Sequence, residues 1–243
     1  MWILIGISFL AGMSTPLGGL IVVTARRLSR RSLTALLGMA AGIMLTVVVA
    51  ELIPASLKAG GHTLFWPGVA GGWLLMWGLK RVVKAALPTQ HDTSGTNAYL
   101  NMGLFIAIAI AIHDLPEGLA IGAGQAVEPR IGLMIALAIA LHNIPEGMSV
   151  AAPMRMGGAS RSRILFTTFL IGLVTPLGTA IAILLTHVAN AFIALSLAFA
   201  SGAMAFVVAQ NILPEAWRAD KRIAIIGTSV GSVLMMAIEW WHG

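Results

Sequence analysis

Apolar runs long enough to cross a membrane recur along the whole chain, and they constrain its fold more than any other feature. One helical span of a bilayer needs about 20 consecutive apolar residues. The sequence contains eight such runs, at residues 2–24, 33–56, 61–79, 99–125, 131–154, 164–187, 190–215 and 223–241. With 58% hydrophobic and 10% charged residues, the composition is far from that of soluble domains. Because 243 residues hold at most about eight or nine spans with short loops, no room remains for a soluble domain. We therefore predict an all-α integral membrane protein with eight transmembrane helices, folded as a single domain over residues 1–243.

The 15 Lys and Arg residues alternate between the connections of these runs. Thirteen lie in the first, third, fifth and seventh connections, and only Lys58 and Arg130 lie in the even ones. We expect a multi-pass protein of the cell (inner or plasma) membrane. Because cytoplasmic loops carry the excess of Lys and Arg, we expect both termini outside the cytoplasm. The first run lacks a basic start and a cleavage site, so we expect it to remain as a span. The net charge of +6 is then a topology signal, and nucleic acid is not an expected partner.

An internal repeat relates the two ends of the chain. Residues 12–19 (GMSTPLGG) match residues 172–179 (GLVTPLGT) at an offset of 160, and residues 40–56 match residues 200–216 at the same offset. This offset equals five spans, and an odd number of spans inverts one copy relative to the other. We predict a 3+2+3 arrangement, in which inverted repeats at 1–84 and 160–243 enclose central helices within 99–154. Such repeats are typical of carriers that bind their substrate near the bilayer midplane.

The two central runs carry related polar hexapeptides, HDLPEG at 113–118 and HNIPEG at 142–147. In each, the His and the Glu are four residues apart and share one helix face. Together, His113, Glu117, His142 and Glu146 offer two imidazoles and two carboxylates, a set that suits Zn²⁺ and also accepts Fe²⁺, Mn²⁺, Co²⁺ or Cd²⁺. Asp114 and Asn143 lie one position further round each helix. They can supply oxygens to a second ion bridged by the two glutamates, which makes a dinuclear site.

Two further polar residues, Glu51 and Asn211, correspond at the offset of 160. They are either ligands at the entrance and exit of a metal path or interfacial residues that face headgroups. For the hexapeptides, the alternatives to transport are a buried polar knot between two helices and a membrane di-metal enzyme. Zinc proteases use H-E-x-x-H and bundle di-iron enzymes use E-x-x-H, whereas each hexapeptide has the spacing H-x-x-x-E with a proline inside it, which argues against the enzyme. A channel-like pore is a second transport hypothesis. No Walker motif is present, so we do not expect ATP to drive transport directly. We expect a transported divalent metal and no organic cofactor.

These residues resemble the ZIP (Zrt/Irt-like) family of divalent metal transporters, because of the paired H-x-x-P-E-G motifs and the 3+2+3 organisation. The resemblance implies a first metal site at His113, Glu117, His142 and Glu146, and a second at which Asp114 and Asn143 join the two glutamates. It implies uptake of Zn²⁺, or of Fe²⁺, Mn²⁺, Co²⁺ or Cd²⁺, into the cytoplasm without enzymatic activity. It also implies an elevator motion of spans 1, 4, 5 and 6 in a homodimer. Thr175 stands where some bacterial relatives carry a glutamate.

Overall fold

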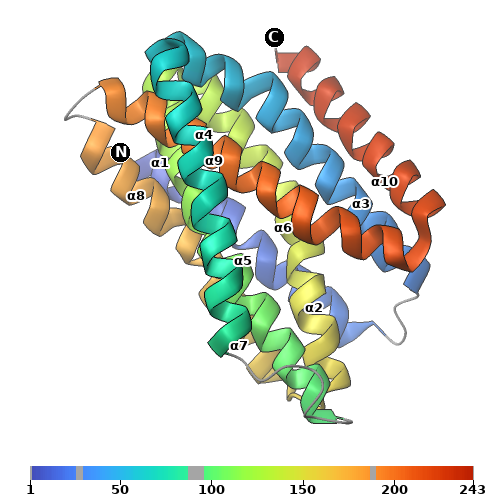
Figure 1. Cartoon of the computed structure of the whole chain (residues 1–243). Coiled ribbons are helices and arrows are strands. Elements are labelled where there is room, and N and C mark those ends of the chain that lie inside the picture. The colour runs from blue at the N-terminus through green and yellow to red at the C-terminus, as the bar shows by residue number, and fades with distance from the viewer. Residues whose placement is uncertain (1, 26–29, 87–95, 187–189, 243) are drawn as a thin grey trace.

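Helices make up all the regular structure of the chain in the computed structural model, which describes residues 2–25, 30–86, 96–186 and 190–242 (Figure 1). The elements are α1 (Trp2–Gly12), α2 (Ser14–Thr24), α3 (Arg30–Val47), η1 (Val48–Leu52), α4 (Ile53–Ala86), α5 (Thr96–Val127), α6 (Pro129–Met156), α7 (Arg161–Gly172), α8 (Val174–Thr186), α9 (Asn190–Val207), η2 (Val208–Ile212) and α10 (Leu213–His242). The segments η1 and η2 are π-helical turns. No strand occurs in the described ranges, which confirms the all-α prediction.

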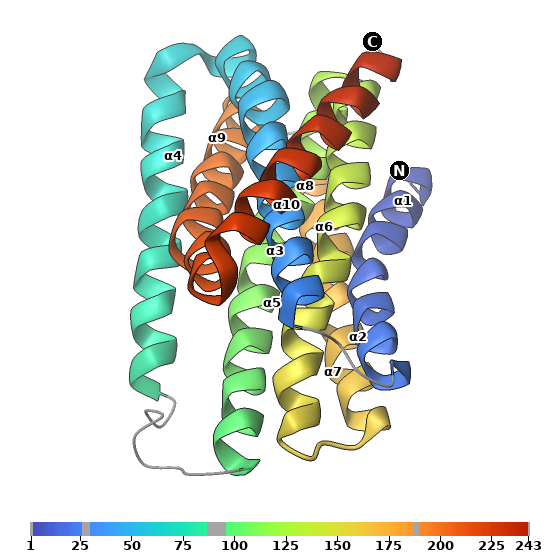
Figure 2. The same ribbon diagram turned by 90° about the vertical axis from the view of Figure 1, so that its right-hand side faces the viewer.

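Six helical stretches in the described part of the chain are long and apolar enough to cross a membrane. Four of them match predicted runs one to one. The other two, Thr34–Val82 and Ala191–Ile238, contain 49 and 48 residues, more than twice the length that one crossing needs. Both contain a residue with non-helical backbone, and the chain doubles back there, so that α4 returns beside α9 and α10 beside α3 (Figures 1 and 2). The eight predicted runs fit this arrangement, and the number of crossings stays a prediction.

The two reversals have local causes. Gly61 has φ 60° and ψ −173°, and a positive φ is readily adopted only by glycine. Asp220 has an extended backbone, and its Oδ1 accepts hydrogen bonds from the backbone N–H groups of Arg222 (3.0 Å) and Ile223 (3.1 Å). An aspartate in this position caps the helix that restarts after it.

Glycines set how closely the helices pack. A β-carbon at Gly42 of α3 would lie 2.1 Å from the Thr228 carbonyl oxygen of α10. One at Gly202 of α9 would lie 2.1 Å from the Val69 carbonyl oxygen of α4. Since neither position has room for a side chain, α3 packs on α10 and α9 on α4 at close backbone distance, as small residues allow within membranes.

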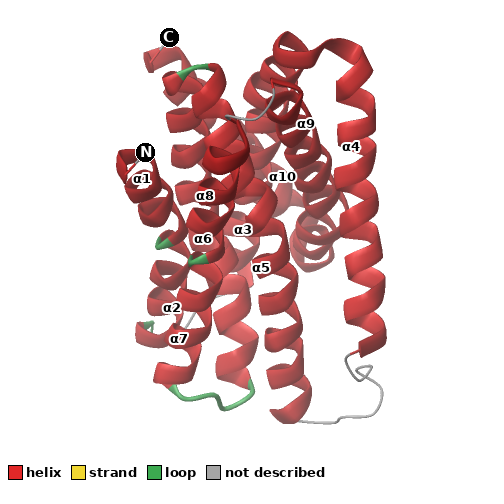
Figure 3. Cartoon of the chain, turned by 90° about the vertical axis from the view of Figure 1, so that its left-hand side faces the viewer, coloured by secondary structure: helices red, strands yellow, loops and turns green. Residues whose placement is uncertain are grey.

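The remaining helices surround α5 and α6. These helices come from two segments of the chain, α1–α2 and α5–α8. Short connections join α1 to α2, α5 to α6, and α7 to α8 (Figure 3). The α1–α2 break falls at Met13 and the α7–α8 break at Leu173, and the π-turns begin at Val48 and Val208. Each of these two pairs is separated by 160 residues, the offset of the sequence repeat.

Candidate metal centre

The two hexapeptides lie opposite each other on α5 and α6, deep inside the protein. His142 is at the middle of α6, and its Nε2 shares a hydrogen bond with Glu117 Oε1 of α5 at 3.0 Å. Both side chains are fully buried, and Glu146, one turn after His142, is 2% exposed. One ligand atom from each of Glu117, His142 and Glu146 lies within 4.8 Å of the other two. The structure therefore brings together three of the four residues expected at the first metal site.

The fourth residue, His113, lies in α5 one turn before Glu117. Its side chain is outside what the structure describes, so its position as a ligand stays a prediction.

The two residues expected at a second ion are buried on the same helices. Asp114 and Asn143 are both fully buried. The Asn143 Nδ2 donates to the Ala11 carbonyl oxygen of α1 at 3.3 Å, which leaves Asn143 Oδ1 without a hydrogen-bond partner among the described residues. An amide oxygen held in this way is a suitable ligand for a hard or borderline cation. The compact three-residue group does not include Asp114, and the second site stays a prediction.

The two expected path residues lie apart from the group, in the π-helical turns. Glu51 lies in η1 and Asn211 in η2, and both are half-buried. Glu51 is within electrostatic range of Glu128 and Arg130, at the connection between α5 and α6. The compact group of ligand atoms does not include Glu51. π-Helical turns occur often at functional sites, but an entrance or exit role for either residue stays a prediction.

Two buried threonines lie next to the centre, and neither was predicted as a ligand, although Thr175 stands where some bacterial relatives carry a glutamate. Thr15 and Thr175 are fully buried, and in the described part of the chain neither hydroxyl has a hydrogen-bond partner. A β-carbon at Gly147 would lie 1.9 Å from the Thr15 carbonyl oxygen, and one at Gly118 would lie 2.1 Å from that of Thr175. The Thr-Pro-Leu-Gly repeat at the offset of 160 is the sequence signal that could have identified them.

The charge of the region favours a bound cation. Asp114, Glu117 and Glu146 place three carboxyl groups in the interior of the helix bundle. The sequence has no Lys or Arg between Lys84 and Arg130, or between Arg130 and Arg155. Burying carboxylates in an apolar medium is costly unless positive charge compensates them, and a divalent cation supplies that charge.

Comparison with known proteins decides the family. The sequence profile described as "ZIP Zinc transporter" matches residues 80–239. The chain is 35% identical over 253 residues to the zinc transporter ZupT of Corynebacterium glutamicum, with 96% of both chains covered. It is 34% identical over 245 residues to the zinc transporter GufA of Myxococcus xanthus, again with 96% of both chains covered. It is 36% identical over 259 residues to the zinc transporter ZupT of Chlorobium limicola, with 96% of this chain and 97% of the relative covered.

The chain belongs to the ZIP zinc transporter family. The family match includes both hexapeptides, and the full-length relatives extend the similarity to nearly the whole chain. Membership confirms the resemblance drawn from the paired H-x-x-P-E-G motifs. Together with the six membrane-competent helical stretches in the described residues, it identifies this ZIP family member as a multi-pass membrane protein of a transporter family.

Proposed function

We propose that this ZIP family protein carries divalent transition-metal cations, with Zn²⁺ as its principal cargo, across the cell membrane into the cytoplasm. The observation that carries the proposal is the buried group of Glu117, His142 and Glu146, in a chain similar over 96% of its length to zinc transporters. In this proposal the connections rich in Lys and Arg face the cytoplasm and both termini face outward.

The first ion is held by the two glutamates, His142 and His113. Imidazole nitrogen and carboxylate oxygen are ordinary ligands of tetrahedral Zn²⁺. Fe²⁺, Mn²⁺, Co²⁺ and Cd²⁺ accept the same donors, so the ligand set allows a wider cargo than zinc. Since imidazole must be neutral and carboxyl groups ionised to bind, we expect acid to weaken metal binding.

A second ion is held beside the first by Asp114 and Asn143, with Glu117 and Glu146 as bridging ligands. Support comes from the burial of Asp114 and Asn143 and from the fixed orientation of the Asn143 amide, whose nitrogen donates to Ala11. Glu51 and Asn211 are proposed to act as the entrance and exit ligands of the path.

The chain crosses the membrane eight times in a 3+2+3 inverted repeat. Support comes from the backbone reversals at Gly61 and Asp220, because each divides a helical stretch that is twice the required length. Further support comes from the paired helix breaks and π-turns at the offset of 160. Gly12 and Gly172, which correspond in the repeat, also approach each other directly, since a β-carbon on either would lie within 2.3 Å of the other's carbonyl oxygen.

Transport takes place by an elevator motion of two helix groups. We define the transport group as α1, α2 and α5–α8, and the frame group as α3, α4, α9 and α10. Every close approach that a glycine mediates between described helices joins members of the same group. The two groups also touch each other, α5 against α9 and α3 against α6, but without such glycine contacts. Tight packing within groups and looser packing between them suits two bodies that slide. A homodimer, implied by the family resemblance, completes the proposal.

Uptake of ⁶⁵Zn²⁺ into proteoliposomes that contain the purified protein tests this function. We expect uptake that saturates with zinc concentration, needs no ATP and is competed by Cd²⁺. Uptake that rises linearly through the micromolar range would favour the channel-like pore. Tight zinc binding without any flux would contradict the transport proposal and favour a structural or enzymatic metal site.

A further inference from the structure

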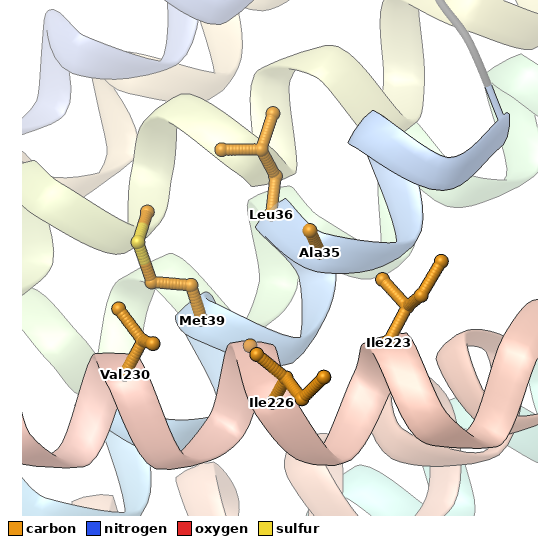
Figure 4. Close-up of a pocket in the computed structure, with 7 residues that line it drawn as sticks. Ala35, Leu36, Met39, Ile223, Ile226 and Val230 are labelled. Atoms are coloured by element: carbon orange, nitrogen blue, oxygen red, sulfur yellow. The ribbon is translucent and has the colours of Figure 1, made fainter.

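An apolar groove runs between α3 and α10 on the frame group, away from the metal centre. It has a volume of about 300 Å³ and is lined by apolar side chains from both helices (Figure 4). The labelled lining residues are Ala35, Leu36 and Met39 of α3 and Ile223, Ile226 and Val230 of α10. From Ile223 to Val230 the groove follows α10 for about 10 Å, at roughly 1.5 Å per residue.

The groove exists because two helices approach closely along their glycines. A β-carbon at Gly38 would lie 2.5 Å from the Ala224 carbonyl oxygen, and one at Gly227 would lie 2.4 Å from that of Ala35. With the backbones this close, the larger side chains diverge on either side of the contact line and leave a channel between them. Ile226 and Val230 are 63% and 52% exposed, so the channel is open at the protein surface.

The helices run parallel here, because the contact of Gly38 with Ala224 is followed four residues later on both helices by that of Gly42 with Thr228. Their basic ends therefore lie at the same end of the groove. Arg31 precedes the groove by one turn on α3, and Lys221 and Arg222 directly precede it on α10.

All three cationic side chains, those of Arg31, Lys221 and Arg222, are exposed. The Lys221 Nζ lies 5.9 Å from the ring centre of Trp217. The nearby carboxylate of Asp220 accepts hydrogen bonds from two backbone N–H groups of α10. Among the described side chains, this end of the groove thus presents the cations of Arg31, Lys221 and Arg222, together with the Asp220 carboxylate that serves as a helix cap.

The related pair, α9 and α4, does not repeat this basic end. At the offset of 160, Arg31 corresponds to Ala191, Lys221 to Gly61, and Arg222 to His62. The cations are therefore a property of the α3–α10 groove and not of the repeated helix pair.

We propose that this groove binds one acyl chain of an anionic phospholipid, whose phosphate is held by Arg31, Lys221 and Arg222. An apolar channel open to the bilayer suits a hydrocarbon chain, and clusters of Lys and Arg at a membrane surface attract anionic headgroups. The bound lipid would fill the space between two helices of the frame group and hold them together. This inference does not depend on the metal centre.

Native mass spectrometry of the purified protein in detergent tests the inference, with phosphatidylglycerol and phosphatidylcholine of identical acyl chains as probes. We expect bound phosphatidylglycerol to exceed bound phosphatidylcholine. Replacing two cations, Lys221→Gln with Arg222→Gln, should weaken phosphatidylglycerol binding roughly 30-fold, since each basic residue near the surface contributes about a factor of five. The matched double variant Arg161→Gln with Arg163→Gln, also exposed and basic, should bind as the parent protein does.

A second pair of variants tests the groove itself. Val230→Trp fills the channel and should displace the lipid, whereas Val233→Trp, at a residue 66% exposed that does not line the groove, should not. Equal binding of phosphatidylglycerol and phosphatidylcholine to the parent protein would overturn the inference. An equal loss of phosphatidylglycerol binding in the two double Gln variants would overturn it as well. A smaller fraction of dimer in Val230→Trp, with lipid binding unchanged, would also overturn it. That result would show that a second copy of the chain occupies the groove.

Discussion

Two glycines, Gly118 and Gly147, set the distance between the metal centre and the neighbouring helices. Each follows a buried glutamate directly, and each lies against a threonine carbonyl of another helix. A side chain at either position would separate α5 from α8 or α6 from α2 at the level of the proposed ligands. The glycines of the two hexapeptides thus serve packing, while the glutamates that precede them belong to the proposed ligand set.

Gly147→Ala should destabilise the protein by about 1–3 kcal/mol, the usual cost of overpacking. Its β-carbon would lie 1.9 Å from the Thr15 carbonyl oxygen, which is backbone and cannot turn aside. Thermal unfolding in detergent measures the effect. The control is Gly6→Ala in α1, where nothing lies within 4 Å and alanine improves helix propensity, so its unfolding temperature should be unchanged or raised. Equal unfolding temperatures for the two variants would show that this contact does not limit packing.

At the residue scale, the sequence placed Glu117, His142 and Glu146, which the structure brings together, in one predicted site, but it did not predict their contacts. The spacing of His142 and Glu146 follows from helical periodicity, which is a local property. The hydrogen bond from Asn143 to Ala11 joins residues 132 positions apart, and the 3.0 Å contact of His142 with Glu117 depends on how two helices are packed. Such contacts follow from tertiary packing, which a single sequence does not reveal.

At the scale of elements, α2 ends against a side chain from α6. The Arg155 Nη1 donates to the carbonyl oxygens of Val22 and Ala25, the latter at 2.8 Å. A cation at a helix C-terminus satisfies free carbonyl groups and interacts favourably with the helix dipole. Arg155 therefore stabilises the end of α2 and joins it to the end of α6.

Arg155→Ala should lower the free energy of local opening at the end of α2 by about 1 kcal/mol. This change is equivalent to roughly fivefold faster amide exchange over residues 22–25. Hydrogen–deuterium exchange followed by mass spectrometry measures this change. Arg161→Ala, at an exposed residue that begins α7, is the matched control and should leave exchange in α2 unchanged. If both variants leave exchange at residues 22–25 as in the parent, the cap contributes nothing to the stability of α2.

The elements also show where sequence reasoning stops. Hydrophobic runs predicted helices at nearly all the right positions, because burial in lipid requires both apolar side chains and internal hydrogen bonds. The π-turns at Val48–Leu52 and Val208–Ile212 were not predicted, since they change the hydrogen-bond register without changing the apolar pattern. The cap at Asp220 was also missed, because the charged segment from Arg218 to Arg222 was expected to be a plain connection.

For the whole molecule, the central question of topology is how often the two long stretches cross the membrane. The backbone reverses at Gly61 and at Asp220, and the proposed eight crossings place these reversals on opposite sides of the membrane. The 3+2+3 repeat requires this placement, because an inverted repeat relates the outer side of one copy to the inner side of the other.

Single cysteines test that topology directly, since the chain contains none of its own. We expect His62→Cys to react with a membrane-impermeant maleimide added outside intact cells. We expect Ala219→Cys to react only after the cells are permeabilised. Both residues are exposed in the structure. Labelling of both positions from the same side would contradict the eight-span inverted arrangement.

Metal is proposed to cross the membrane through the buried group of Glu117, His142 and Glu146 on α5 and α6. The most direct test is the initial rate of ⁶⁵Zn²⁺ uptake by His142→Ala in proteoliposomes, beside the matched His62→Ala. His142 is fully buried against Glu117, whereas His62 is exposed at a backbone reversal. We predict that His142→Ala loses at least about 90% of the uptake, equivalent to roughly 1.4 kcal/mol or more of lost stabilisation, and that His62→Ala retains it. Parent-like uptake in His142→Ala, with equal protein in the liposomes, would contradict the account.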